Sequence, residues 1–254
     1  ISGNTFTSLS VNNTTGFIEL IRGSGSVPAN GTQDVNNNAI VGTFAKTAAG
    51  GTVYGLDLSG SSATGAVINI NGNNFSNVTL TGSTQMYGLS NTDGGSNNPT
   101  KTIQGNTFNN WAAGTQQITG VRASGGSFSV TSNSFTNATS SQNVTGINIT
   151  GGNTVNVTSN VVNSLSTSGS NMSGITIGAA TAVDISANVV NTLSATAASS
   201  TVTGIATSAT ATNVFRNKVY DLQTTGATGS VFGFLASGAA STVYDNRVGD
   251  RLGP

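Results

Sequence analysis

Apolar residues along the chain recur at fixed places around an asparagine. The segment VTSNVVNSLS, residues 157–166, returns 28 residues later as ISANVVNTLS, residues 185–194. Each copy has Ile or Val three residues before the asparagine and another apolar residue two residues after it. Nine such phrases follow one another at intervals of 27–35 residues, and their asparagines are Asn4, Asn38, Asn73, Asn106, Asn133, Asn160, Asn188, Asn217 and Asn246. A repeat of this length predicts a solenoid or a stacked array rather than a compact globule.

A second phrase, apolar-x-Gly-apolar, stands between successive asparagine phrases. VYGLDL and ITGVRA are two examples, and the glycines are Gly55, Gly88, Gly120, Gly146, Gly174, Gly204 and Gly233. Gly16, in TGFIEL, has the place of a degenerate first copy. These glycines indicate either a second bend in each repeat or a column of small residues.

Within each repeat, apolar and polar residues alternate with period two. VTGINIT, residues 144–150, and NTVNVTS, residues 153–159, alternate in this way and are rich in β-branched residues. This alternation predicts short β-strands, and no segment sustains a helical period. Propeller blades would need longer repeats, of about 40–50 residues. The pattern therefore predicts an all-β chain: a single parallel β-helix domain over residues 1–254, with about nine coils of two or three strands.

The repeated asparagine has a physical role in such a fold. Coils stack about 4.8 Å apart, and each coil must bend between its strands. Asn tolerates left-handed backbone angles, so we expect it to supply the bend. Stacked in register, each amide would donate to one neighbouring coil and accept from the other, which gives an asparagine ladder. We expect Phe75, Phe108 and Phe135 to form an internal aromatic column that continues as valines.

The composition excludes several classes of function. Only 6% of the residues are charged, and the formal net charge is zero. A nucleic-acid partner is not expected, because phosphate binding needs clustered Lys and Arg. No apolar run approaches the length of a membrane-spanning helix, so membrane insertion is not expected. The chain has no Cys and no His, and it therefore lacks thiolate metal ligands and the commonest general base.

The asparagine phrases, taken together, resemble the right-handed parallel β-helix of the pectin-lyase-like superfamily. The later repeats, VFRNKVYDLQTTGATGSVFGFLASG and VYDNRVGDRL, are similar to repetitive surface proteins of bacteria that use type IX secretion. This second resemblance implies an extracellular or cell-surface location in a bacterium. The chain begins inside a repeat, at ISGNTF, and we expect it to be a segment of a longer surface protein.

The resemblance implies two kinds of catalytic site, and neither can be carried over onto this sequence. Hydrolases of the superfamily use clustered aspartates, and its lyases use calcium-binding aspartates with a basic residue. The charged residues here are mostly isolated, with one charge, Asp184, in residues 123–215. We predict no catalytic residue, no metal site and no cofactor. Calcium is the only candidate cofactor, because NTDGGSNNPT, residues 91–100, faintly resembles a calcium loop.

One charged cluster stands out near the end of the chain. It comprises Arg216, Lys218, Asp221, Asp245, Arg247, Asp250 and Arg251. In register, Arg216 would stack near Asp245 and Asp221 near Asp250. The cluster is either a carboxylate pair that binds a cation or a sugar, or a solvated corner of weak ion pairs. The second interpretation is favoured.

The sequence favours a non-enzymatic stalk or adhesin over two alternatives. Its partners would be glycans or other cell-surface components, with end-to-end self-association through exposed sheet edges. The longer early loops, residues 22–34 and 90–101, are the expected recognition elements. Tyr54, Tyr87, Tyr220 and Tyr244 could stack on sugar rings if exposed, whereas Trp111 is expected in the core. The alternatives are a polysaccharide lyase or hydrolase, and an ice-binding protein, which would need a regular Thr array that is missing here.

Overall fold

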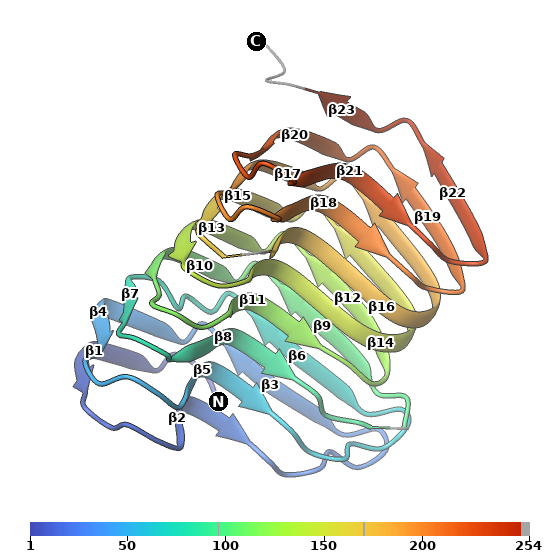
Figure 1. Cartoon of the computed structure of the whole chain (residues 1–254). Coiled ribbons are helices and arrows are strands. Elements are labelled where there is room, and N and C mark those ends of the chain that lie inside the picture. Colours follow the sequence, from blue (N-terminus) through green and yellow to red (C-terminus); the bar gives the residue numbers. More distant parts are fainter. Residues whose placement is uncertain (96, 170, 250–254) are drawn as a thin grey trace.

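The computed structural model describes residues 1–95, 97–169 and 171–249, and it is a parallel β-solenoid without any helix in those residues. Figure 1 shows the coils stacked in chain order from β1 to β23. All strand pairs run parallel, as expected for successive coils. No helix in the described part of the chain is long and apolar enough to cross a membrane.

Each coil contributes strands to three faces. The asparagine face is a nine-stranded sheet made of β1 (Thr5–Val11), β4 (Ala39–Lys46), β7 (Val78–Leu80), β10 (Thr107–Ala112), β13 (Ser134–Ser140), β15 (Val161–Thr167), β17 (Val189–Ala195), β20 (Lys218–Thr224) and β23 (Arg247–Gly249). The glycine face is made of β2 (Phe17–Gly23), β5 (Thr52–Leu58), β8 (Gln85–Asn91), β11 (Ile118–Ala123), the first halves of β14 (Val144–Thr158) and β16 (Asn171–Ser186), β18 (Thr201–Thr207) and β21 (Ser230–Ala236). The third face is made of β3 (Thr32–Asn36), β6 (Val67–Asn71), β9 (Thr100–Gln104), β12 (Ser127–Thr131), the second halves of β14 and β16, β19 (Ala211–Phe215) and β22 (Ala240–Tyr244).

The all-β solenoid fold is confirmed, but the expected number of coils is wrong. The solenoid has about seven turns rather than nine. Counting one turn for each asparagine phrase overestimates the number. The ninth phrase is followed by β23 alone within the described residues.

The asparagine ladder is confirmed, and the amides of its inner members, Asn38 to Asn217, are fully hydrogen-bonded. The Nδ2 of each ladder asparagine donates to Oδ1 of the next one, at 2.8–3.0 Å. The backbone N–H donates to that same Oδ1 at 2.9–3.1 Å. The second Nδ2 hydrogen goes to a carbonyl of the preceding coil, as from Asn160 to Val130 at 2.8 Å. Each inner asparagine therefore ties its own coil to both neighbours.

The ladder asparagines do not supply the left-handed bend, which corrects the sequence prediction. The residue just before each of them does, with φ between 51° and 71°: Gly3, Asn37, Gly72, Gly105, Ser132, Ser159, Ala187, Arg216 and Asp245. The physical reason is that the asparagine's own N–H and amide both point along the ladder, so the turn falls one residue earlier. A second left-handed column, four residues after the asparagine, comprises Ser8, Gly42, Asn77, Asn110, Asn137, Ser164, Thr192 and Asp221.

The glycines of the second phrase form a small-residue column rather than a bend. A Cβ on Gly88 would lie 2.5 Å from the Phe108 ring, and a Cβ on Gly146 would lie 2.7 Å from Val162. The glycine face thus leaves room for the phenylalanines and valines of the asparagine face. Gly16 is not the first copy as expected, because the register of β2 with β5 places Leu20 opposite Gly55.

The internal aromatic column lies where the sequence predicts it. Phe108 pairs in register with Phe135, which pairs with Val162, and the Phe75 and Phe108 rings lie 6.5 Å apart. Trp111 is buried as expected, and its Nε1 donates to the carbonyl of Phe75 at 2.7 Å. Aromatic and aliphatic side chains of one column therefore fill the core beside the ladder.

Replacing Asn160 with Leu should lower the free energy of unfolding by about 3 kcal/mol or more, because buried donors and acceptors in two coils lose their partners. The measurement is the melting temperature. The control is Asn163→Leu, on the partly exposed outer side of the same coil. An equal melting temperature for Asn160→Leu and the control would contradict the ladder's role.

Replacing Thr192 with Asn should raise the free energy of unfolding by about 0.5–1 kcal/mol. Thr192 is exposed, and its φ of 52° is unfavourable for a β-branched residue. Asn137 already occupies the equivalent place in an earlier coil. Thr196→Asn is the control, because Thr196 is also exposed but is not left-handed. The expectation fails if both variants shift the chemical-denaturation midpoint equally.

Candidate functional site

Part of the predicted charged cluster gathers around one hollow at the last corner of the solenoid. Arg216, Lys218, Asp245 and Arg247 line this hollow of about 230 Å³ together with Asn217. Arg216 Nε and Asp245 Oδ2 are 3.4 Å apart, and both side chains are about two-thirds exposed. Exposed pairs of this kind contribute about 0–1 kcal/mol to stability.

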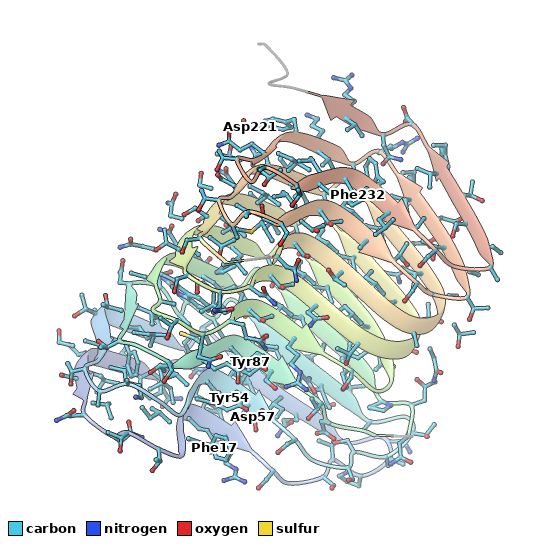
Figure 2. All side chains as sticks on the ribbon, viewed as in Figure 1. Phe17, Tyr54, Asp57, Tyr87, Asp221 and Phe232 are labelled. Carbon is cyan, nitrogen blue, oxygen red and sulfur yellow. The ribbon has the colours of Figure 1, made fainter. Side chains whose placement is uncertain are left out.

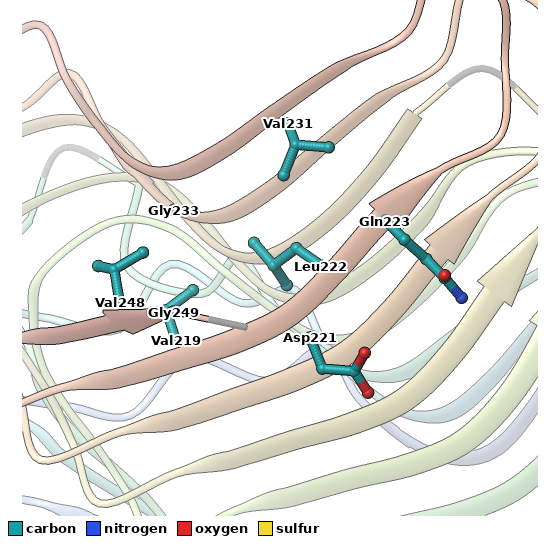
Figure 3. Close-up of a pocket in the computed structure, with 8 residues that line it drawn as sticks. All are labelled: Val219, Asp221, Leu222, Gln223, Val231, Gly233, Val248 and Gly249. Atoms are coloured by element: carbon teal, nitrogen blue, oxygen red, sulfur yellow. The ribbon is translucent and has the colours of Figure 1, made fainter. Parts of the chain in front are cut away.

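Asp221 lies apart from that hollow. It lines a different pocket with Val219, Leu222 and Val231, and Figure 3 shows its carboxylate directed away from Leu222 and Val231. Its φ of 54° places it in the second left-handed column, where Asp is one of the tolerated residues. Asp250 and Arg251 lie outside the described residues.

An aromatic strip crosses the first coils on the outer side of the glycine face. Tyr54 and Tyr87 are register partners whose stacked rings lie 5.3 Å apart, and Phe17 meets Tyr54 edge-on at 6.1 Å. Phe17 is 70% exposed, whereas Tyr87 is largely buried. Figure 2 shows the three rings close together, with Asp57 beside Tyr54. Exposed Phe17 and partly exposed Tyr54 therefore present aromatic surface to solvent, with Tyr87 packed behind them.

Charged and amide groups border the aromatic strip. The Arg122 guanidinium lies over the Tyr87 ring at 5.2 Å, and Tyr87 OH accepts from Gln85 Nε2 at 2.8 Å. Arg22 and Glu19 form an ion pair at 3.4 Å on the same face. Burial raises the pKa of Tyr54, and the nearby Asp57 carboxylate adds to the rise. The Tyr54 hydroxyl therefore stays protonated at neutral pH and can donate a hydrogen bond.

Beyond the strip, the same outer column carries hydroxyl groups and then another aromatic residue. In register, Tyr87 is followed by Thr119, Thr145, Ser173, Thr203 and Phe232. A shallow hollow of about 270 Å³ on this face is lined by Asn143, Thr145, Asn148, Asn171, Ser173, Thr176, Thr201 and Thr203. Aromatic rings therefore lie at both ends of a polar track that runs along the solenoid axis (Figure 2).

Sequence reasoning named Tyr54 and Tyr87 but missed Phe17, Glu19, Asp57 and Arg122. The signal that could have found them is alignment on the glycine phrase, where a tyrosine directly precedes Gly55 and Gly88. Asp57 and Arg122 each follow a glycine of this phrase, Gly55 and Gly120, by two residues. With Gly16 as the first glycine of the column, the alignment does not place Phe17 and Glu19 beside Tyr54.

The loop at residues 90–101, expected to be a recognition element, is fixed by buried charges. Asp93 is fully buried, and its carboxylate accepts from Ser62 N at 2.7 Å and from Ser62 Oγ at 2.8 Å. Lys101 is also fully buried, and its Nζ donates to the carbonyls of Asp93 and Ser124. Ser62 Oγ also accepts from Val27 N at 2.8 Å, which ties in the loop at residues 22–34. These side chains join the loops to one another rather than project toward a ligand.

The chain was compared with family models, with curated proteins and with solved structures, and none of them matches it. Within the described ranges, no group of three or more Asp, Glu, His or Cys side chains is placed to hold a metal ion.

The stability of the protein should rise between pH 7 and pH 9.5 because of Lys101. Burial lowers the pKa of Lys101 to about 7, against 10.5 for the unfolded chain. Between these values the unfolded state binds more protons, so the free energy of unfolding increases with pH. Urea denaturation across this range provides the measurement.

The matched variant is Lys101→Met, which removes the titrating group but keeps the buried stem. Its stability should depend less on pH than that of the parent. Burial lowers the pKa of Lys46 as well, but Lys46 is present in both proteins and cancels in the comparison. Identical pH slopes would contradict the assignment to Lys101.

Proposed function

We propose that the chain is a non-catalytic structural and adhesive solenoid whose glycine face binds a glycan chain lying along the solenoid axis. The observation that supports this most is the aromatic strip of Phe17, Tyr54 and Tyr87, continued in register by hydroxyl side chains. Sugars present apolar C–H faces and a rim of hydroxyl groups, and this combination of aromatic rings with hydroxyl and amide groups complements both.

The rigidity of the scaffold favours this role. Successive strands lie about 4.8 Å apart, so an extended polymer would meet a new set of side chains at each coil. The strip lies on paired strands, and the hydrogen-bonded asparagine ladder holds successive coils in register. Binding should therefore cost little conformational entropy. Several weak contacts along one face would then add up to useful affinity.

The location and the wider family belong to the same proposal. The resemblance to pectin-lyase-like β-helices and to type IX-secreted surface proteins supports an extracellular place on a bacterial cell, within a longer surface protein.

A screen against a glycan array, combined with polysaccharide-cleavage assays with and without calcium, tests the proposal. Binding without cleavage and without a calcium requirement is expected. The double variant Phe17→Ala/Tyr54→Ala should bind at least about tenfold more weakly, which corresponds to about 1.4 kcal/mol.

The control for that variant is Tyr220→Ala, because Tyr220 lies on the outer side of the asparagine face, where its OH accepts from Asn191 at 2.7 Å. This control should bind like the parent. Cleavage of a polysaccharide by the parent protein would replace the adhesive proposal with an enzymatic one.

A further inference from the structure

Two positive side chains stand directly opposite each other on the last coils. Lys218 in β20 and Arg247 in β23 are register partners in adjacent parallel strands. Neighbouring strands lie about 4.8 Å apart, and like charges in opposed positions destabilise a sheet. Both residues are exposed. The equivalent places in the two preceding coils are Val161 and Val189, so the fold itself does not require a charge there.

The nearby carboxylate does not neutralise this pair. Among the described residues that line the corner hollow, Asp245 is the one acid, and it lies 3.4 Å from Arg216. Three cations and one anion therefore surround about 230 Å³ in a chain with only eight Lys and Arg residues. Counted over the described residues that line the hollow, the local charge is positive although the formal charge of the chain is zero.

The backbone at this corner also carries a residue that the fold does not favour. Arg216 has a φ of 55° at a place where earlier coils use Gly105, Ser132 and Ser159. Any residue with a Cβ costs roughly 1–2 kcal/mol in the left-handed region. The preceding coil holds Ala187 in the left-handed region at the same place, so the conformation belongs to the fold and the positive charge of Arg216 is what is specific to this corner.

An aromatic pair leads directly into the same corner. Phe215 and Tyr244 immediately precede Arg216 and Asp245, and their rings stack in parallel at 5.2 Å and 5°. Tyr244 is 49% exposed. The same column carries Thr158 and Ser186 in earlier coils. The aromatic residues of this column therefore lie in the same two coils as the three cations.

We propose that this corner is a second binding site, which recognises the sulfate or carboxylate groups of an anionic polysaccharide. Arg216, Lys218 and Arg247 supply charge-assisted hydrogen bonds to the anionic group, and a sugar ring packs against Tyr244. The site shares no residue with the glycine face. A polysaccharide fits better than a nucleic acid, because the described cations gather at one corner rather than along a stripe.

The test measures binding of dextran sulfate, carboxymethyl dextran and unsubstituted dextran at several salt concentrations. The parent should bind the two anionic polymers more tightly than dextran, with an affinity that falls as salt rises. The double variant Lys218→Gln/Arg247→Gln should bind them at least about tenfold more weakly, which corresponds to about 1.4 kcal/mol. Unchanged affinity in this variant would overturn the proposal.

A relocation variant separates a local site from a net-charge effect. It adds Thr107→Lys and Ser134→Lys to the double variant, which restores two opposed cations at the same strand positions in earlier coils. Anionic polymers should not regain affinity, because Arg216 and the Phe215–Tyr244 ring pair lie beside the original positions and not beside the new ones. Full recovery would overturn the proposal, and so would equally tight binding of duplex DNA by the parent protein.

A failure of the corner site can be distinguished from a failure of the glycan site proposed on the glycine face. The variant Phe17→Ala/Tyr54→Ala should keep its affinity for dextran sulfate if the corner acts alone. Loss of that affinity in this variant, with Lys218→Gln/Arg247→Gln unaffected, would move anion binding to the glycine face and contradict the assignment.

Discussion

The hydrogen bonds of the ladder asparagines set the geometry on which the other features of the solenoid depend. Each inner Oδ1 accepts a side-chain N–H and a backbone N–H from the preceding coil, and each Nδ2 also donates to a carbonyl of that coil. A buried amide that lost one of these partners would be costly, so the coils must keep their register at this corner. The same register aligns the aromatic and valine column with the glycine column. It also aligns the outward-facing side chains of successive coils.

A second constraint explains the residues at the corners. The chain enters the left-handed region once before each ladder asparagine, and again four residues after each of the first eight. Gly meets this demand at the lowest cost, and Asn and Asp are the next best tolerated. Asp221 and Asp245 therefore have a structural reason to be where they are, and neither needs a catalytic role. Arg216 has no such reason, and the charge of its side chain is what distinguishes that corner.

The interior could be predicted from the sequence because it repeats with every coil. The ladder, the Phe75–Phe108–Phe135 column and buried Trp111 all follow from residues at constant distances from an asparagine. The outer faces could not be read in the same way. The separation between ladder asparagine and column glycine varies from 13 residues, Asn133 to Gly146, to 17 residues, Asn38 to Gly55. A change of one residue reverses which side chains face outward, so the aromatic strip emerged only from the pairing of the strands.

The repeated hydrogen bonds of the asparagine ladder also determine how the solenoid responds to a pulling force. Because each coil contacts mainly its neighbours, a load applied to the chain would detach coils from an end one at a time. Each detached coil of 27–35 residues would add roughly 90–120 Å of extended chain. Since nearly identical amide bonds resist each step, successive coils would yield at similar forces. Such a rod would absorb tension in equal increments and re-form its register from the coils that stay attached.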